Sequence, residues 1–171
     1  PAEIGKNHGV YRVDSEGNVG GFLHKKTVEQ LQKLGASDDQ GNVDIDTGAV
    51  IFNSEMLQAL YQLVDTKEKF VAYVNESTRL SFYADFLYPL ASDSTLEQYY
   101  KETPEGDFTP ELEQCRTELW SVLHPYQMKL IRMSPAAFIH FGTTKELREL
   151  MTERMDEFYY LGWTSNINTN R

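Results

Sequence analysis

The chain has 171 residues, of which 26 are acidic and 16 basic, and its formal net charge is −10. This length suffices for one domain with a hydrophobic core, and the acidic balance excludes a nucleic-acid-binding protein, which needs a basic face to displace counterions. A single cysteine, Cys115, excludes a disulfide framework and a cysteine-based zinc site.

The sequence has no apolar run near the roughly 20 residues of a membrane helix, and no signal peptide is visible. We therefore expect a cytoplasmic protein that does not contact a membrane. The chain begins at Pro1 and ends in a polar stretch, so we expect a piece of a longer protein. Its domain is expected over residues 1–162, with a polar tail or the start of a next domain at 163–171. Cutting a domain exposes apolar surface, through which the piece is expected to dimerise.

The first predicted element is a β-hairpin. Residues 10–13 and 19–23 are extended segments rich in apolar side chains, and residues 14–18 between them have the composition of a turn. The hairpin is the first of the segments that point to function.

The second strand of this hairpin ends in three basic residues. His24, Lys25 and Lys26 follow the strand, and Thr27 is placed to cap a helix over residues 28–34. Two lysines beside a helix N-terminus form an anion site, with charge from the side chains and donors from the backbone. The alternative is a pair of solvated surface lysines.

A second sheet segment is predicted over residues 43–54. It ends in an apolar run suited to a central strand, and residue 53 or 54 is placed to cap a helix that ends at Leu63. Gly48 lies inside this strand, so either a ligand or another backbone approaches there, or the glycine marks a simple bulge. The buried face of the helix is expected at Met56, Leu57, Leu60 and Leu63.

The middle of the chain is predicted to be mostly helical. Residues 75–91 form an apolar helix face that carries one acid, Asp85. Residues 109–110 supply a threonine cap and a first-turn proline for a helix that ends at residues 124–125. Residues 128–133 are predicted to form a further strand. The order of elements is that of a mixed α/β protein.

The last third carries a strand, a glycine turn and a capped helix start. An apolar run over residues 137–140 closes on His140, Gly142 breaks the strand, and residue 143 or 144 caps a helix near Lys145. His140 is thus placed at the carboxyl end of a strand, where open α/β sheets build their ligand crevice.

Taken in order, these segments resemble the second half of a sugar-1-phosphate nucleotidylyltransferase domain, a Rossmann-like fold with a mixed sheet flanked by helices. Their residue patterns resemble one branch, the L-fucose-1-phosphate guanylyltransferase region, including that of bifunctional fucokinase and fucose pyrophosphorylase proteins. A Tyr83-x-Asp85 pair resembles the same branch, and the similarity spans about residues 7–155. The motifs are His8-Gly9-Val10-Tyr11, His24-Lys25-Lys26, Asp46-Thr47-Gly48-Ala49-Val50 and His140-Phe141-Gly142-Thr143-Thr144-Lys145-Glu146-Leu147.

The resemblance implies a parent enzyme that forms GDP-L-fucose and pyrophosphate from GTP and L-fucose 1-phosphate with Mg²⁺. Lys25 occupies the family's lysine position and is the expected catalytic residue, because a cation at the phosphate offsets the repulsion between two anionic reactants. The family's glycine-rich nucleotide loop does not occur before His8. The chain is therefore expected to supply the sugar-phosphate half and to be inactive alone. The alternatives are another sugar-1-phosphate nucleotidylyltransferase, or a non-catalytic regulatory module of the same fold.

The resemblance also implies the substrate-binding residues. Asp46 is expected to accept hydrogen bonds from sugar hydroxyls or to brace its loop. Asp85 is expected to contact the sugar, to hold the neighbourhood of Tyr83, or to be an exposed helix acid. His140 stands where many relatives have a magnesium-binding aspartate, and it is expected to bind the metal, donate to a phosphate, or be structural. The full set is His8, Gly9, His24, Lys25, Asp46, Gly48, Asp85 and His140.

Overall fold

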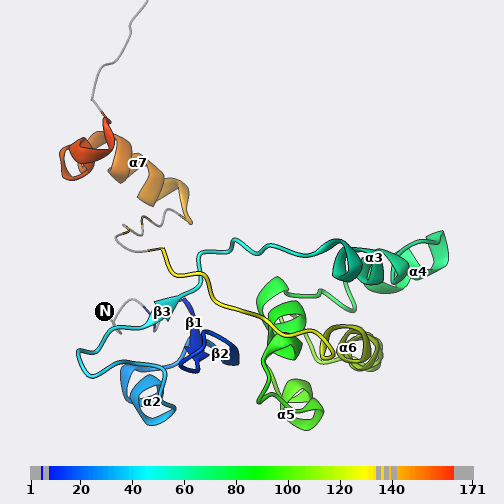
Figure 1. The fold of residues 1–171 in the computed structure, drawn as a ribbon. Coiled ribbons are helices and arrows are strands. Elements are labelled where there is room, and N and C mark those ends of the chain that lie inside the picture. The colour runs from blue at the N-terminus through cyan, green and yellow to red at the C-terminus, as the bar shows by residue number, and fades with distance from the viewer. Residues whose placement is uncertain (1–4, 6–7, 134–135, 137–138, 140–141, 164–171) are drawn as a thin grey trace, which may run out of the picture. The chain divides into compact units, whose positions relative to one another are not determined.

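The structure is a computed structural model that describes residues 5, 8–133, 136, 139 and 142–163 (Figure 1). The chain divides into two compact units, Pro1–Arg132 and Met133–Arg171. Within the described residues, no helix has the length and apolar character needed to cross a membrane.

The first unit contains a small antiparallel sheet. Strands β1 (Gly9–Val13) and β2 (Val19–His24) form the predicted hairpin, and β3 (Asp44–Ile45) pairs with the other edge of β1. The turn is built as its composition predicted, because the Asp14 carboxylate accepts hydrogen bonds from the backbone N–H groups of Glu16 and Asn18. The hairpin prediction is confirmed.

Helix α2 (Val28–Lys33) covers this sheet and begins where predicted. The Thr27 hydroxyl accepts from the N–H of Gln30, and the Gln30 side chain accepts from the N–H of Thr27, which makes a capping box. Leu31 is fully buried and packs with Val10 and Ala36 in a small core of its own.

The predicted central strand over residues 43–54 is wrong beyond its first residues. Only Asp44–Ile45 forms a strand, and residues 49–52 have no regular structure, with Ile51 86% exposed. Gly48, which follows the last paired residue by three positions, has φ +75, a left-handed conformation that breaks an extended backbone. Residues 128–133 are likewise no strand, since only an isolated bridge joins Lys129 to Asn18.

The α/β class is therefore confirmed, but the described sheet has three antiparallel strands where a mixed sheet was expected. The Rossmann-like arrangement stays a prediction. The rest of the first unit is helical. Its helices are α3 (Ser54–Gln62), α4 (Lys67–Tyr73), the π-helix η1 (Phe82–Leu87), the 3₁₀-helix η2 (Tyr88–Leu90), α5 (Leu96–Tyr100) and α6 (Pro110–Leu123).

Local capping chemistry starts these helices as predicted. Asn53 caps α3 and Thr109 caps α6, each accepting a hydrogen bond from an N–H three residues on. The expected buried face of α3 is confirmed at Met56, whereas Leu57 is 58% exposed. The predicted helix over residues 75–91 is shorter and less regular, because it consists of η1 and η2.

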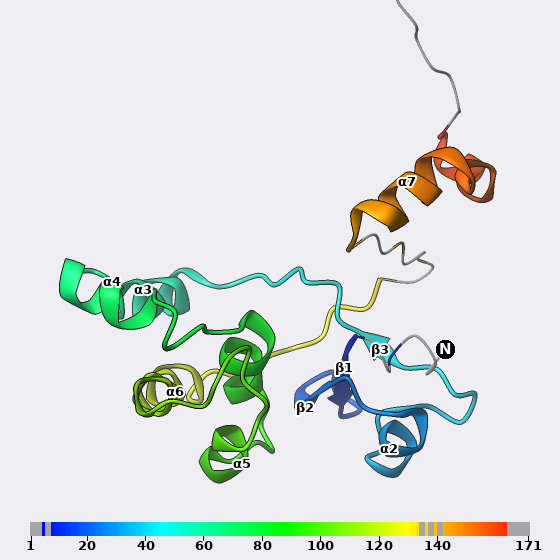
Figure 2. The same ribbon diagram turned by 180° about the vertical axis from the view of Figure 1, so that it is seen from behind.

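One core joins the sheet to the helices through β2, the strand of the hairpin that lies nearest to them in Figures 1 and 2. Backbone hydrogen bonds reinforce this junction, since Ser92 donates to Val19 at 3.0 Å and Asp93 to Gly20 at 3.1 Å. The fully or nearly buried members of this core are Tyr11, Val19, Phe22, Met56, Tyr73, Leu87, Leu90, Ala91, Cys115, Leu119 and Leu123.

The second unit contains α7 (Thr144–Thr152) and the 3₁₀-helix η3 (Met155–Leu161). Thr143 caps α7 in a capping box with Glu146, which confirms the predicted helix start. Of the predicted strand over residues 137–140, only residue 139 is among the described residues, and His140 lies outside them.

Candidate functional site

Four of the predicted site residues lie together at one end of the sheet. Gly9 and His24 are partners across the β1–β2 hairpin. The N–H of Asp46 donates to the carbonyl of Gly9 at 2.9 Å, and the N–H of Gly48 donates to Asp46 Oδ1 at 3.1 Å. Residues that are far apart in the sequence are therefore collected from β1, β2 and the segment after β3.

Asp46 is the polar centre of this group. It is only 6% exposed, and its Oδ1 also accepts a hydrogen bond of 2.8 Å from the hydroxyl of Tyr11. Burial, and then this bond to Asp46, raise the pKa of Tyr11 far above its ordinary value, so the phenol remains a donor. These bonds fit the predicted bracing role of Asp46, and its contact with a sugar stays a prediction.

Gly9 is required by close packing. A Cβ at this position would lie 2.5 Å from Cζ and 2.7 Å from Cε2 of Phe22, well inside van der Waals contact. Glycine therefore lets the Phe22 ring lie across β1 and reach the core beside Tyr11. Whether the open backbone of Gly9 also faces a sugar stays a prediction.

Gly48 is required by its backbone conformation and less by the space around it. A Cβ here would lie 3.7 Å from the hydroxyl oxygen of Tyr83, an ordinary contact, but φ +75 disfavours any other residue type. The exposed turn at Gly48 thus lies next to a tyrosine hydroxyl.

Three rings gather beside this turn. His24 and Tyr83 have centroids 5.6 Å apart with planes 16° from parallel, and Phe22 lies 6.2 Å from Tyr83 and 6.3 Å from His24. Burial, and then the charge of Lys25, lower the pKa of His24, so its imidazole is neutral at pH 7. Tyr83 was not among the predicted contact residues; the only signal for it was its place two residues before Asp85.

Lys25 follows β2 directly and is exposed. It has φ +52, a left-handed conformation that costs a residue with a side chain about 1–2 kcal/mol. Its N–H donates to the carbonyl of half-buried His8 at 3.4 Å. His8, another of the predicted site residues, therefore also lies at this end of the sheet. The start of α2 offers fewer free backbone N–H donors to an anion than predicted, because the capping box already occupies the N–H groups of Thr27 and Gln30.

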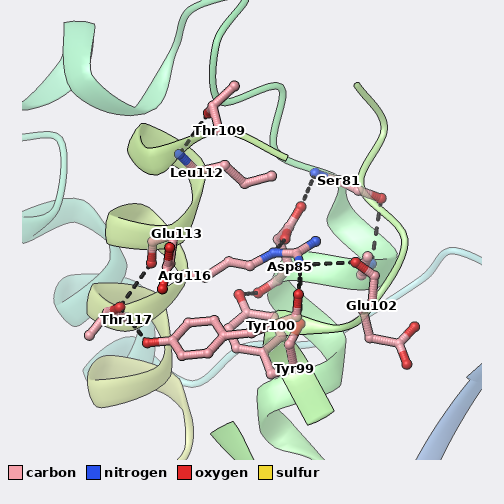
Figure 3. A network of polar contacts seen from close by, with 11 residues as sticks. Ser81, Asp85, Tyr99, Tyr100, Glu102, Thr109, Leu112, Glu113, Arg116 and Thr117 are labelled. Atoms are coloured by element: carbon pink, nitrogen blue, oxygen red, sulfur yellow. Dashed lines mark hydrogen bonds and ion pairs between the residues drawn. The ribbon is translucent and has the colours of Figure 1, made fainter. Parts of the chain in front are cut away.

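Asp85 is fully buried, so the alternative of an exposed helix acid is wrong. Its Oδ1 accepts from Arg116 Nε at 2.7 Å and its Oδ2 accepts from the N–H of Ser81 at 2.6 Å (Figure 3). This geometry fits the predicted role of holding the Tyr83 segment. A direct contact with a sugar stays a prediction.

Arg116 itself was missed by sequence reasoning. It lies on α6 four residues after Leu112 and three before Leu119, so helical spacing places it on the buried face. Its Nη1 donates to the carbonyls of Tyr99, Tyr100 and Glu102. A buried arginine implies a buried acid, and Asp85 was the acid on the neighbouring apolar segment.

No dedicated metal site is evident in the described part of the chain, which gathers no group of three or more His, Cys, Asp or Glu side chains. His140, the predicted metal ligand, lies outside that part. No described residue is therefore assigned to magnesium.

A pocket of about 870 Å³ opens elsewhere in the first unit, and none of the hairpin-end residues lines it. Its wall is mainly apolar and comes from α3, α4, η1 and α6, with Arg79 and Glu105 among the few charged residues. No sequence pattern predicted this pocket. Its size is within the range of small-molecule sites.

Comparison with known proteins identifies a family for the chain. The family model described as the fucose pyrophosphorylase domain matches residues 1–170, nearly the whole chain. No curated protein and no solved structure matches the chain. The match confirms the family that the order of the sequence motifs predicted.

Proposed function

We propose that this chain, which belongs to the fucose pyrophosphorylase domain family, binds L-fucose 1-phosphate for a nucleotidyltransferase reaction with GTP. In that reaction an oxygen of the sugar phosphate attacks the α-phosphorus of GTP. The bond from the α-phosphorus to the bridging oxygen of the β-phosphate breaks, and GDP-L-fucose and pyrophosphate form.

One observation carries the proposal, the gathering of predicted residues at the end of the hairpin. Gly9 and His24 are cross-strand partners, Asp46 and Gly48 are hydrogen-bonded to that end, and Lys25 is adjacent in the chain. The group combines a cation, a carboxylate and an exposed backbone turn, which are the contacts that a sugar phosphate needs.

Lys25 is proposed to contact the phosphate. An ammonium group at the phosphate is a charge-assisted donor and offsets the repulsion between the two anionic substrates. Asp46 is proposed to accept from a sugar hydroxyl, and its position is already fixed by Tyr11 and Gly48. A carboxylate that is fixed before binding loses little entropy when the sugar arrives.

Magnesium is the metal that the family resemblance implies. A magnesium ion is often held by one or two carboxylates together with substrate phosphates. The described residues contain no group of three or more potential ligand side chains, so none of them is assigned to the metal.

Calorimetric titration of the chain with L-fucose 1-phosphate tests the proposal. Loss of one charge-assisted phosphate contact costs about 1.5–3 kcal/mol, so Lys25→Ala is expected to weaken binding roughly 10-fold to 150-fold. Lys33→Ala, an equal charge change in the last turn of α2, is the matched control and is expected to bind as the parent chain does.

Free L-fucose completes the design, because it lacks the phosphate and Lys25→Ala is expected to leave its weak binding unchanged. The same titration with D-mannose and D-glucose 1-phosphates separates the fucose assignment from other sugars. Equal affinities for Lys25→Ala and Lys33→Ala, or no binding of any sugar phosphate, would overturn the proposal.

A further inference from the structure

We propose that Tyr83, with His24 beside it, forms a ring platform that packs against the methyl-bearing face of the sugar and so selects a 6-deoxy sugar phosphate. This inference rests on the proposed function and deepens it. It assigns specificity to Tyr83, a residue that the family motifs place near the site without a role.

The three rings at the hairpin end lie side by side. Their centroid distances are 5.6, 6.2 and 6.3 Å, and every pair of planes is within 19° of parallel. Three parallel rings at nearly equal distances cannot form one column, in which the outer two would be twice as far apart. They are instead offset from one another, with their planes nearly parallel.

Only two of the three ring residues have surface open to a ligand. Phe22 is 4% exposed and belongs to the core, whereas His24 and Tyr83 are half-buried. Of the three residues, Tyr83 and His24 are therefore the two that offer exposed surface to a ligand. Since the pKa of His24 is lowered, the imidazole joins the platform as a neutral ring.

Neighbouring residues of η1 hold Tyr83 in place. Phe82 packs edge-on against its ring at 5.7 Å and 73°, and Ala84 is buried. Two residues later, Asp85 anchors the π-helix η1 to Arg116. π-Helical turns frequently occur at functional sites, and a rigid aromatic side chain loses little entropy on binding.

The platform borders polar groups that suit the rest of a sugar. The Tyr83 hydroxyl lies beside the exposed turn at Gly48, whose N–H is bonded to Asp46. A tyrosine presents an apolar body and a polar tip. A 6-deoxyhexose has the same division, with a methyl group on one side and hydroxyls around the remainder of the ring.

L-Galactose 1-phosphate is the sharpest probe, because it differs from L-fucose 1-phosphate only by a hydroxyl on C6. An apolar surface rejects an added hydroxyl by at most about 100-fold, so we expect the parent chain to prefer L-fucose 1-phosphate by roughly 10-fold to 100-fold. Both ligands carry the same phosphate, so the contact of Lys25 cancels from the ratio.

The experiment measures both affinities by calorimetry for the parent chain and for Tyr83→Phe, Tyr83→Leu and Tyr83→Ala. The preference is expected to persist in Tyr83→Phe, which keeps the ring, to shrink in Tyr83→Leu, and to fall to within about 3-fold in Tyr83→Ala, which removes the apolar surface. Tyr61→Ala, at a 66% exposed tyrosine on α3, is the control and should keep the full preference.

The outcomes separate this inference from the proposed function. If the parent chain shows no preference, or Tyr83→Ala and Tyr83→Leu both keep it, the platform is overturned while sensitivity to Lys25→Ala still supports sugar-phosphate binding. If neither sugar phosphate binds the parent chain, both proposals fail. Should Tyr83→Ala not fold, the comparison of Tyr83→Leu with Tyr83→Phe decides.

Discussion

Asp85 and Arg116 form an ion pair of 2.7 Å in which neither side chain has any exposed surface (Figure 3). Arg116 also lies over the rings of Tyr99 and Phe108, at 5.3 and 5.7 Å from their centroids. Its Nη2 is the one polar atom of this pair that is buried without a hydrogen-bond partner among the described residues. The pair thus ties η1, α5 and α6 together.

Breaking this pair is expected to destabilise the fold severely. Arg116→Met leaves the carboxylate of Asp85 buried without its counter-charge, which costs about 3–5 kcal/mol of the free energy of unfolding. Urea unfolding measures the loss. The control is Arg132→Met, because Arg132 pairs with Asp44 at the same 2.7 Å but is 61% exposed, and such pairs contribute up to about 1 kcal/mol.

A double variant distinguishes a buried charge from lost packing. Asp85→Leu combined with Arg116→Met removes both charges, so the combined loss is expected to be smaller than the sum of the two single losses. Additive losses, or an Arg116→Met variant as stable as Arg132→Met, would contradict this account of the pair.

Gly9→Ala is expected to disturb the site and the core together. The new methyl group would meet the Phe22 ring at 2.5 Å, and overpacking of this kind costs about 1–3 kcal/mol. Gly21→Ala is the control in the same hairpin, because its methyl group meets only the flexible side chain of Arg12, at 3.3 Å from Nε. Thermal unfolding compares the two, and an equal shift in their midpoints would show that Gly9 is not required by packing.

Thr109 is expected to stabilise more than the helix that it caps. Its hydroxyl accepts from the N–H of Leu112 at 3.1 Å and donates to the carbonyl of Ser77 at 2.7 Å, which joins α6 to the turn before η1. Thr109→Ala is therefore expected to cost about 1–2 kcal/mol, whereas Thr109→Ser keeps both bonds and most of the stability.

Denaturant titration again gives the measurement, with Thr95→Ala as the control. Thr95 caps only the five residues of α5, through a single bond of 3.3 Å from the N–H of Gln98. A loss for Thr109→Ala no larger than that for Thr95→Ala would mean that the bond to Ser77 contributes nothing.

The parts of the fold that could be predicted are those set by local chemistry. The turn at Asp14 and the helix caps at Thr27, Asn53, Thr109 and Thr143 each depend on partners within four residues. Such contacts are visible in the sequence because the chain cannot separate them. The hairpin and the start of every one of these helices followed.

The failures depend on distant partners. An apolar run becomes a strand only when another strand offers it hydrogen bonds, and residues 49–52 find none among the described residues. The partner of Asp85 lies 31 positions away, and the contact between Tyr83 and His24 spans an even longer stretch of sequence. No short-range pattern reveals either contact, so three roles stayed open for Asp85, and Tyr83 was noted only as part of the Tyr83-x-Asp85 pair.

His24 gives the site a pH dependence whose sign follows from its surroundings. Burial lowers its pKa most, Lys25 and Lys26 lower it further, and Glu105 and Asp46 oppose them. An unfolded histidine titrates at about pH 6.5, so below that value the unfolded chain binds more protons than the folded one. Stability is therefore expected to fall as the pH drops from about 6.5 through the lower pKa of folded His24.

Nuclear magnetic resonance titration of the His24 ring checks this sign, with an expected midpoint below 6.5. Lys25→Gln is expected to raise the midpoint because it removes the second-largest cause of the shift, whereas Lys33→Gln, in the last turn of α2, should leave it unchanged. His24→Gln should remove this part of the acid sensitivity in urea unfolding. A midpoint at or above 6.5 in the parent chain would mean that the imidazole is not the neutral, half-buried ring on which the platform with Tyr83 depends.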